Sequence, residues 1–283
     1  MADASTLMRI ACVQMRSGLD RPAITRDALA LISEAAGQGA TFIATPEMTN
    51  IVDRKPKRLL ETLPSESDLE EVTAFGDAAR EHKVWLLIGS VAAKAPGVSK
   101  AVNRSLLFAP TGDIVARYDK IHMFDVDLPD GETWKESAVY QPGDKAVLVD
   151  ASAGRIGLTV CYDVRFPHLY RQLAQAGALL FVVPAAFTAQ TGRAHWRTLL
   201  CSRAIENGAF VAAPAQGGRH EDGRDTYGHS MIIGPWGEII AELDHDDPGV
   251  LVADIDFERA REARSRIPNL GLDADFKITI LNQ

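Results

Sequence analysis

Short runs of apolar residues alternate along the chain with longer stretches in which apolar positions recur every three or four residues. The short runs have the length of buried strands, and the longer stretches have the period of amphipathic helices. Strands are predicted at 9–15, 40–44, 84–91, 102–108, 114–118, 146–149, 155–160, 179–183, 210–213, 228–233, 238–242 and 250–255. Helices are predicted at 22–37, 68–82, 167–176, 193–206 and 257–266. This alternation predicts an α/β fold in which helices lie outside sheets.

The same pattern continues through the whole chain. No stretch of shifted composition, low complexity or fixed-period repeat separates one part from another. With 283 residues, 46% of them hydrophobic, the chain is long enough to bury a substantial core. We therefore expect a single domain over residues 1–283, with its core at about 8–266 and a C-terminal extension at 267–283.

Charge and cysteine content narrow the function classes. The formal net charge of −8 gives no general attraction to nucleic acids or anionic membranes. No apolar run reaches the roughly 20 residues that span a bilayer, and residues 1–6 lack the features of a secretory signal. The three cysteines are far apart and outside metal-binding spacings, which argues against a disulfide framework or a zinc site. We expect a reduced, cytoplasmic protein without nucleic-acid or membrane partners.

Cys161 stands where a strand is predicted to give way to a helix. It follows the strand at 155–160 and precedes the helix that begins at 167. Its thiol is therefore expected at an elbow where backbone N–H groups can converge on a reacting carbonyl. Cys12, within a strand, and Cys201, within a helix, have the positions of ordinary buried apolar residues. Cys161 is the candidate nucleophile, and the alternative is that it too is a small buried hydrophobe.

Glu47 and Lys120 also follow predicted strands. Glu47 ends the stretch FIATPE, just past the strand at 40–44, and Lys120 comes after the strand at 114–118. In α/β folds the carboxyl ends of strands are where binding and catalytic sites form. Taken singly, each of these two residues would by default be a solvated surface charge.

Together, the three positions form a recognisable series of motifs. The segments TPE at 45–47, YDKIHMFD at 118–125 and LTVCYDVRFP at 158–167 occur in this order. Further matches are PAAFT at 184–188, AHW at 194–196, GHS at 228–230 and PWG at 235–237. The chain resembles the nitrilase superfamily of carbon–nitrogen hydrolases from about residue 10 to residue 268. It is most similar to the amidase branch that contains omega-amidases and deaminated-glutathione amidases.

The resemblance implies a four-layer α-β-β-α sandwich and a catalytic set of Glu47, Lys120 and Cys161. Cleavage of an amide needs a nucleophile, a base that activates it, and positive potential where the oxyanion forms. Cys161 would attack the carbonyl carbon to give a thioester, and Glu47 would move the protons. Lys120, with the backbone N–H of Tyr162, would stabilise the oxyanion. The resemblance also gives Glu136 a supporting role, against the alternative of a solvated loop glutamate. This chemistry requires no metal or cofactor.

The substrate is suggested by the residues around Cys161. Nitrile-hydrolysing relatives commonly follow the cysteine with Trp-Glu, whereas this chain has Tyr162-Asp163, as amidases do. By the same resemblance, Arg165 binds a substrate carboxylate, and Phe187 and Thr191 line the pocket with Tyr162. A guanidinium can hold a carboxylate by two hydrogen bonds. We expect an omega-amide of a short dicarboxylic or α-keto acid, with an ion pair to Asp163 as the alternative role of Arg165.

One departure from the branch puts the precise substrate in doubt. Omega-amidase-like relatives often continue the glutamate motif into a loop of the type FNSPY, where this chain reads MTNIV at 48–52. An N-carbamoyl amino acid hydrolase is the first alternative, and a nitrilase is less favoured. A binding protein on an inactive scaffold would have lost catalytic residues, and a thiol redox sensor would need an exposed thiol.

Three of the motifs contain a histidine, so a protease with a Cys–His pair is a further alternative. The resemblance gives His122, His195 and His229 no role as a base, and His195 and Trp196 are expected to pack inside the structure. The expected partner is therefore a small-molecule amide. Family members commonly assemble, so we also expect a homodimer or a larger homo-oligomer.

Overall fold

The computed structural model describes residues 6–95, 97–127, 131, 133–151 and 154–281. Two six-stranded sheets form the centre of this part of the chain. The first has the order β16-β1-β2-β3-β4-β5, and the second has the order β15-β14-β11-β10-β9-β8. In each sheet the central strands are parallel: β1, β2 and β3 in the first, and β9, β10 and β11 in the second. The outer strands of both sheets pair antiparallel.

The bounds of these elements are as follows. The first sheet consists of β1 (Leu7–Gln14), β2 (Phe42–Ala44), β3 (Trp85–Lys94), β4 (Ala101–Phe108), β5 (Ile114–Asp119) and β16 (Gly249–Asp256). The second consists of β8 (Val147–Ala151), β9 (Gly154–Leu158), β10 (Leu180–Val182), β11 (Phe210–Ala213), β14 (Met231–Ile233) and β15 (Ile239–Glu242). The α-helices are α1 (Arg21–Gly37), α2 (Pro56–Thr62), α3 (Glu70–His82), α4 (Pro167–Gln175), α5 (Ala189–Asn207) and α6 (Phe257–Arg266).

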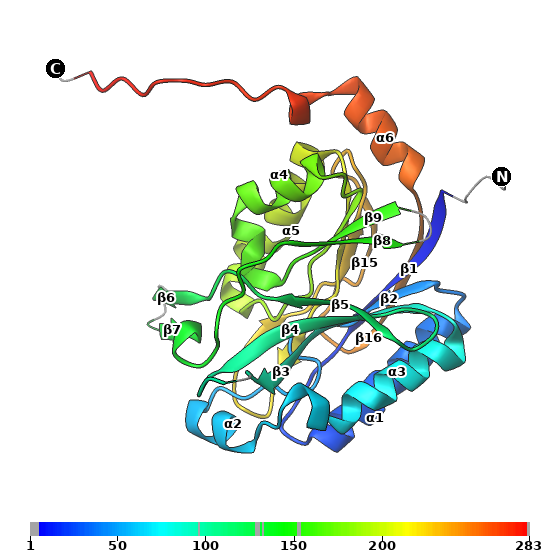
Figure 1. Cartoon of the computed structure of the whole chain (residues 1–283), viewed down its shortest axis with the longest axis vertical. Coiled ribbons are helices and arrows are strands. Elements are labelled where there is room, and N and C mark those ends of the chain that lie inside the picture. The colour runs from blue at the N-terminus through cyan, green and yellow to red at the C-terminus, as the bar shows by residue number, and fades with distance from the viewer. Residues whose placement is uncertain (1–5, 96, 128–130, 132, 152–153, 282–283) are drawn as a thin grey trace.

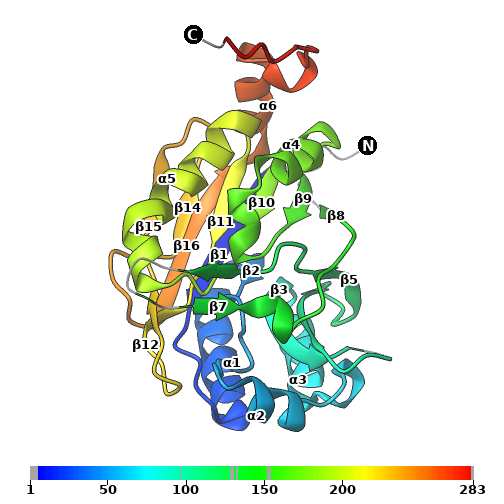
Figure 2. The ribbon, with the colours of Figure 1, turned by 90° about the vertical axis from the view of Figure 1, so that its left-hand side faces the viewer.

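The two sheets pack face to face, and helices cover their outer faces. Helices α1 and α3 contact the first sheet, and α4 and α5 contact the second (Figures 1 and 2). Side chains of β1 alternate accordingly. Ile10 and Cys12 belong to the core that contains the second sheet, whereas Ala11 and Val13 belong to the core under α1 and α3. Because successive residues of a strand face opposite sides, a sheet buried on both faces reads as a continuous apolar run. The predicted four-layer α-β-β-α architecture is confirmed.

Some predicted boundaries are wrong, for identifiable reasons. The strand predicted at 228–233 begins only at Met231, because Gly228 and His229 have left-handed backbone angles, with φ of 64° and 55°. Helix α5 begins at Ala189 rather than at 193, because the Thr188 hydroxyl caps its first turn. The sequence pattern does not predict helix α2 or the short ribbons β6–β7 (Asp125–Asp127 and Thr133–Lys135) and β12–β13 (Gly217–Arg219 and Asp225–Tyr227). They are too short and polar to show a period.

Within the described ranges no helix is long and apolar enough to cross a membrane. After α6 the chain contacts α4 through Asp273, which pairs with Arg171. Beyond that point it runs away from the body of the molecule (Figure 1). Phe276, Ile278 and Ile280 in this segment are 80–85% exposed.

Candidate active site

The candidate catalytic residues come together between the two sheets, at the ends of strands. Glu47 follows β2, Lys120 follows β5, and Cys161 begins a short 3-10 turn (Cys161–Arg165) shortly after β9. Strands β2 and β9 are parallel strands of different sheets, so their carboxyl ends deliver Glu47 and Cys161 to the same region. Glu136 reaches the site from the short turn after β7. The structure therefore brings together all four residues predicted to be catalytic.

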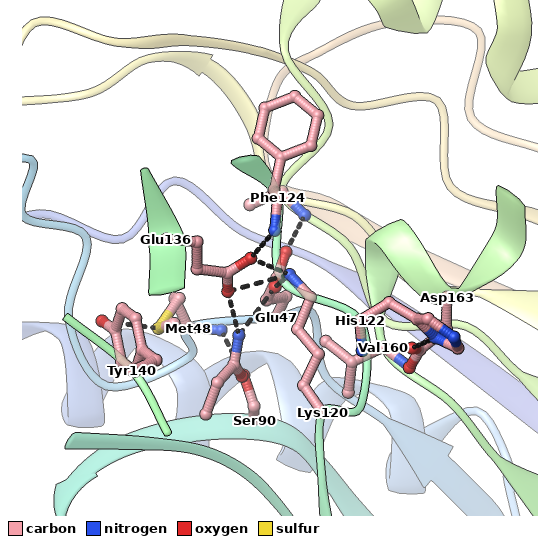
Figure 3. Close-up of polar contacts among 12 residues, drawn as sticks. Glu47, Met48, Ser90, Lys120, His122, Phe124, Glu136, Tyr140, Val160 and Asp163 are labelled. Carbon is pink, nitrogen blue, oxygen red and sulfur yellow. Dashed lines mark hydrogen bonds and ion pairs between the residues drawn. The ribbon is translucent and has the colours of Figure 1, made fainter. Parts of the chain in front are cut away.

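Lys120 is buried and lies between two carboxylates (Figure 3). Its Nζ atom is 2.9 Å from Oε1 of Glu47, and 2.9 and 2.8 Å from Oε1 and Oε2 of Glu136. Burial would lower the pKa of Lys120, but the charges of Glu136 and Glu47 raise it well above its usual value. Lys120 is therefore a permanent cation at this position.

Glu47 is held by donors from three directions. Oε1 accepts hydrogen bonds from Lys120 and, at 2.8 Å, from Nδ2 of Asn103, while Oε2 accepts from the backbone N–H of Ala186 at 2.9 Å. Burial acts to raise the pKa of Glu47, but Lys120 and hydrogen bonds from Cys161 and Asn103 lower it. The carboxylate is consequently ionised, and it lines the same cavity as the Cys161 thiol.

Glu136 is held by the main chain as well as by Lys120. Its Oε2 accepts from the backbone N–H of Phe124 at 2.6 Å, and its Oε1 accepts from Asn103 Nδ2 at 3.2 Å. Asn103, near the start of β4, thus links the two carboxylates, and both are fixed in position before a substrate arrives. These contacts, and a side chain only 12% exposed, exclude the alternative of a solvated loop glutamate.

Cys161 adopts a backbone conformation that a cysteine rarely takes. Its φ is 47°, in the left-handed region, and its N–H donates to the carbonyl of Pro184 at 2.8 Å. Such strain persists only where the surroundings impose it, and it is common at active sites. Burial and the neighbouring Glu47 raise the pKa of the Cys161 thiol well above its usual value. The resting sulfur is therefore a neutral thiol that needs a base.

Asp163 fixes the backbone on both sides of the site, just before Cys161 and just after Lys120. It is fully buried, and its carboxylate accepts from the backbone N–H of Val160 at 2.8 Å, the Tyr118 hydroxyl at 2.7 Å and the backbone N–H of His122 at 3.1 Å. Nδ1 of His122 also lies 2.7 Å from it. Asp163 therefore ties the chain before Cys161 to the segment that carries Lys120, and it forms no ion pair with Arg165 within the described ranges.

A cavity of about 350 Å³ opens onto these residues, a size typical of small-molecule sites. Cys161, Glu47, Lys120 and Glu136 all line it, together with three of the four predicted substrate-binding residues, Tyr162, Phe187 and Thr191.

Arg165 does not line the cavity. Its guanidinium carbon lies 5.9 Å from the ring centroid of Tyr162 and 5.3 Å from that of Phe187, against the aromatic wall. Its Nη2 is 3.3 Å from Nδ1 of His195. The prediction that His195 packs inside is wrong, because its side chain is exposed, whereas Trp196 is buried and donates to the carbonyl of His229.

Residues 9–265 match the carbon-nitrogen hydrolase family. The chain belongs to this family. The predicted family, and the predicted class of reaction, hydrolysis of carbon–nitrogen bonds other than peptide bonds, are confirmed.

Several relatives of this carbon-nitrogen hydrolase are known. A protein of Synechocystis sp. named deaminated glutathione amidase is 41% identical over 92% of this chain and 96% of its own length. The NitFhit protein of C. elegans superposes with a TM-score of 0.88 at 33% identity, over 95% of this chain and 65% of that longer chain. An amidase of the nitrilase superfamily from Nesterenkonia sp., solved with acrylamide on its active-site cysteine, has a TM-score of 0.76 at 26% identity. That comparison covers 94% of this chain and 100% of the amidase.

Three cavity residues of the carbon-nitrogen hydrolase are not predicted from its sequence. Arg54, Trp134 and Arg224 line the same cavity as Cys161. Arg54 and Arg224 lie in stretches of mixed charge, DRKPKR and HEDGRD, that carry no periodic signal and no motif. Asn103 is not predicted either, because it stands inside an apolar run that reads as an ordinary strand. Only tertiary structure reveals these four residues as parts of the site.

Proposed function

We propose that this enzyme is an amidase that uses Cys161 as its nucleophile on the omega-amide of a short dicarboxylic or 2-oxo acid. The observation that supports this most directly is the convergence of Cys161, Glu47, Lys120 and Glu136 on one cavity, where Glu47 is a buried carboxylate 2.9 Å from the Lys120 ammonium. A neutral thiol next to an ionised base that is fixed in position is the arrangement that nucleophilic acyl transfer requires.

The reaction proceeds through successive proton transfers by one carboxylate, two in forming the thioester and two in hydrolysing it. Glu47 takes the thiol proton as the sulfur of Cys161 attacks the amide carbon. The oxyanion forms beside the Lys120 ammonium and the backbone N–H of Tyr162. Glu47 then protonates the departing nitrogen as the C–N bond breaks, which leaves a thioester. Water activated by Glu47 hydrolyses the thioester and restores the thiol.

The net charge of the site does not change as the thiol attacks the substrate. At rest Lys120 carries one positive charge and Glu47 and Glu136 carry two negative charges. When Glu47 accepts the thiol proton, its negative charge disappears and a negative charge appears on the substrate oxygen, beside the same ammonium. A preorganised site of this kind needs little reorganisation as the transition state forms. Glu136 keeps Lys120 protonated while Glu47 is neutral.

The carboxylate of the substrate is proposed to lie against the wall formed by Tyr162, Phe187 and Thr191, with Arg165 supplying positive charge beyond the two rings. Relatives at 38–41% identity named deaminated glutathione amidase support an omega-amide as the substrate. Equal activity on α-ketoglutaramate and on an uncharged alkyl amide would remove the reason for assigning Arg165 this role.

The test is a panel of substrates with wild-type enzyme and Cys161→Ala side by side. It contains α-ketoglutaramate, succinamate, deaminated glutathione, an N-carbamoyl amino acid and a simple nitrile. We expect hydrolysis of the omega-amides, abolished in the variant. Cys201→Ala is the matched control, since Cys201 lies on α5 away from the cavity lining. Release of carbon dioxide with ammonia from the N-carbamoyl compound would favour the alternative activity instead.

We also propose a homodimer or larger homo-oligomer and a cytoplasmic location. The exposed apolar side chains of Phe276, Ile278 and Ile280 alternate along an extended segment and would be covered by a second copy. Phe276→Asp/Ile278→Asp should lower the mass measured by light scattering, and an unchanged mass would contradict this use of the segment. A reducing compartment keeps the catalytic thiol free, and cell fractionation tests that location.

A further inference from the structure

The backbone of the loop that carries Glu47 is strained. Met48, the residue directly after the proposed base, has a φ of 58°, in the left-handed region that residues other than glycine rarely adopt. A residue keeps such a conformation only where its surroundings impose it. The contacts that hold Met48 therefore also fix the direction in which Glu47 points, and they take no part in the proton transfers described above.

One set of contacts ties this loop to the first sheet. The backbone N–H of Met48 donates to the hydroxyl of Ser90, on β3, at 2.9 Å (Figure 3). The backbone N–H of Ser90 donates to the carbonyl of Pro46 at 3.2 Å, and the backbone N–H of Thr49 donates to the carbonyl of Ser90 at 2.8 Å. These contacts hold the loop against its own sheet. They do not fix its distance from the second sheet, from which Cys161 extends.

A second set of contacts comes from Gln216, which follows β11 in the second sheet. Its side chain is fully buried and lies outside the cavity lining. Nε2 of Gln216 is 3.1 Å from the carbonyl oxygen of Glu47, 3.3 Å from that of Met48 and 2.8 Å from the Ser17 hydroxyl. The two carbonyls belong to the peptide groups on either side of the strained residue. Gln216 therefore holds both of these peptide groups from the opposite sheet.

Ser17 fixes the orientation of the Gln216 amide. The backbone N–H of Ser17 donates to Oε1 of Gln216 at 2.9 Å, and its hydroxyl donates to the carbonyl of Thr49 at 3.1 Å. Because Oε1 accepts from Ser17, Nε2 is the atom that faces the loop carbonyls. His220 holds Ser17 in turn, with Nδ1 2.7 Å from the Ser17 carbonyl. Both polar atoms of this buried amide are hydrogen-bonded, which makes its position rigid.

The main chain connects Gln216 to the nucleophile. Its N–H donates at 2.8 Å to the middle carbonyl of the segment 184–186. The first carbonyl of that segment accepts from the N–H of Cys161 at 2.8 Å, and its last N–H donates to Oε2 of Glu47 at 2.9 Å. A path of hydrogen bonds thus runs from the backbone of Cys161, through the segment 184–186 and Gln216, to the backbone of Glu47.

We propose that Gln216 is a positioning residue, which holds the backbone of Glu47 at a fixed place relative to Cys161. Its role rests on the proposed function, in which Glu47 moves the protons of the thiol. Without the Nε2 donor, the two loop carbonyls lose a buried partner and Met48 relaxes toward an ordinary backbone conformation. The Glu47 carboxylate is then displaced from the thiol, and a displacement of about 1 Å can cost about 100-fold in rate.

The test replaces the amide with a side chain of similar length that cannot donate. Gln216→Met should lower kcat on α-ketoglutaramate about 10- to 100-fold. KM should be unchanged, because Gln216 does not line the cavity. Rates are compared per folded molecule, well below the Tm of each variant.

The acid limb of the kcat/KM profile should move to higher pH in the same variant. Lys120 and the hydrogen bond from Asn103 lower the pKa of Glu47. A displaced carboxylate loses part of these contacts, so its pKa rises. The other titratable groups that face this centre, Glu136 and the Cys161 thiol, are present in both enzymes. A purely structural role of Gln216 would not move this limb.

Gln14→Met is the matched control. Gln14 is also fully buried, and its Nε2 donates to the carbonyls of His245 and Asp247 at 2.8 Å each. Its Oε1 accepts from the N–H and the hydroxyl of Ser230 at 2.9 Å each. Gln14 thus makes the same kind of contacts with a loop that carries no proposed catalytic residue. Gln14→Met should lower the Tm to a similar extent and leave kcat and the acid limb at their wild-type values.

A lowered Tm with wild-type kcat and an unmoved acid limb in Gln216→Met would overturn the positioning role and leave the amidase activity intact. Equal losses of kcat in Gln216→Met and Gln14→Met would also overturn it. Gln216→Asn, whose amide is one methylene shorter, replaces Gln216→Met if that variant does not fold, with the same expectations.

Failure of the proposed function gives a different result. If the wild-type enzyme hydrolyses the N-carbamoyl amino acid and no omega-amide, the proposed substrate is wrong. The same comparison on that compound then decides the role of Gln216. Wild-type kcat in Glu47→Gln would overturn both the base and its positioning residue.

Discussion

Replacing Glu136 with glutamine removes one of the two negative charges around Lys120 and preserves the shape of the side chain. Both Glu136 oxygens are within 2.9 Å of Lys120 Nζ. Glu47 keeps the ammonium paired after the change, so no buried charge is left alone. The glutamine NH₂ must also face a donor that Glu136 now accepts from, so the expected loss of stability is at least that of one charge-assisted hydrogen bond, about 1.5–3 kcal/mol. Lys120→Met, which leaves two carboxylates without their cation, should lose more, about 3–5 kcal/mol.

The same substitution should slow the reaction. Without Glu136, Glu47 is the sole anion beside Lys120, so its pKa falls further and it becomes a weaker base. The Lys120 ammonium is also held less firmly where the oxyanion forms. If these effects reach the transition state at the size of one such bond, kcat falls about 10- to 100-fold.

The assay measures kcat at saturating substrate and the free energy of unfolding in urea. Glu66→Gln is the matched control, because Glu66 pairs with Arg104 and Arg117 at 2.8 Å each and does not line the cavity. It should lose stability with kcat unchanged. A Glu136→Gln enzyme that loses stability but keeps wild-type kcat would refute the reasoning, because Glu136 would then be only structural. A loss as complete as that of Cys161→Ala would instead make Glu136 the base.

Three further predictions concern the rest of the site. The Asp163 carboxylate only accepts hydrogen bonds, from backbone N–H groups and a hydroxyl, whereas the amide of Asp163→Asn also donates. The free energy of unfolding measured in urea should therefore fall by about 2–4 kcal/mol, and a loss under about 1 kcal/mol would contradict this role of Asp163. Because the pKa of Glu47 is lowered, its carboxylate stays ionised in mild acid. The acid limb of the kcat/KM profile should therefore lie below pH 4.5, the ordinary pKa of a glutamate, and a limb near about pH 6 would contradict this role of Glu47. Gly89→Ala places a methyl group 1.9 Å from the backbone oxygen of Thr45, two residues before Glu47. Thermal unfolding should therefore show that the free energy of unfolding falls by about 3 kcal/mol or more, and an unchanged Tm would contradict that contact.

Much of the fold and of the catalytic centre can be predicted from the sequence because both depend on the same signal. Continuous apolar runs mark the buried strands, and Glu47, Lys120 and Cys161 each follow one of those runs closely. The ends of neighbouring strands meet in space, so residues at those ends can be grouped from the sequence alone. The motifs add Glu136, which has no strand signal of its own.

The residues that hold or extend the site cannot be predicted in this way. Asn103 lies inside a strand and reads as a tolerated polar residue. The sequence offers Asp163 only as a partner for Arg165, whereas it binds Tyr118 and the His122 segment. Their roles depend on contacts between segments that are far apart along the chain. Local periodicity carries no information about such contacts.

The most direct test of the central claim is the mass of the enzyme during turnover. Wild-type enzyme mixed with α-ketoglutaramate, quenched in acid and digested should carry the acyl group of the substrate as a thioester on Cys161. The peptides that contain Cys12 and Cys201 should be unmodified, and Cys161→Ala should form no adduct and release no ammonia. An acyl group on another residue, or hydrolysis that continues in Cys161→Ala, would contradict the account.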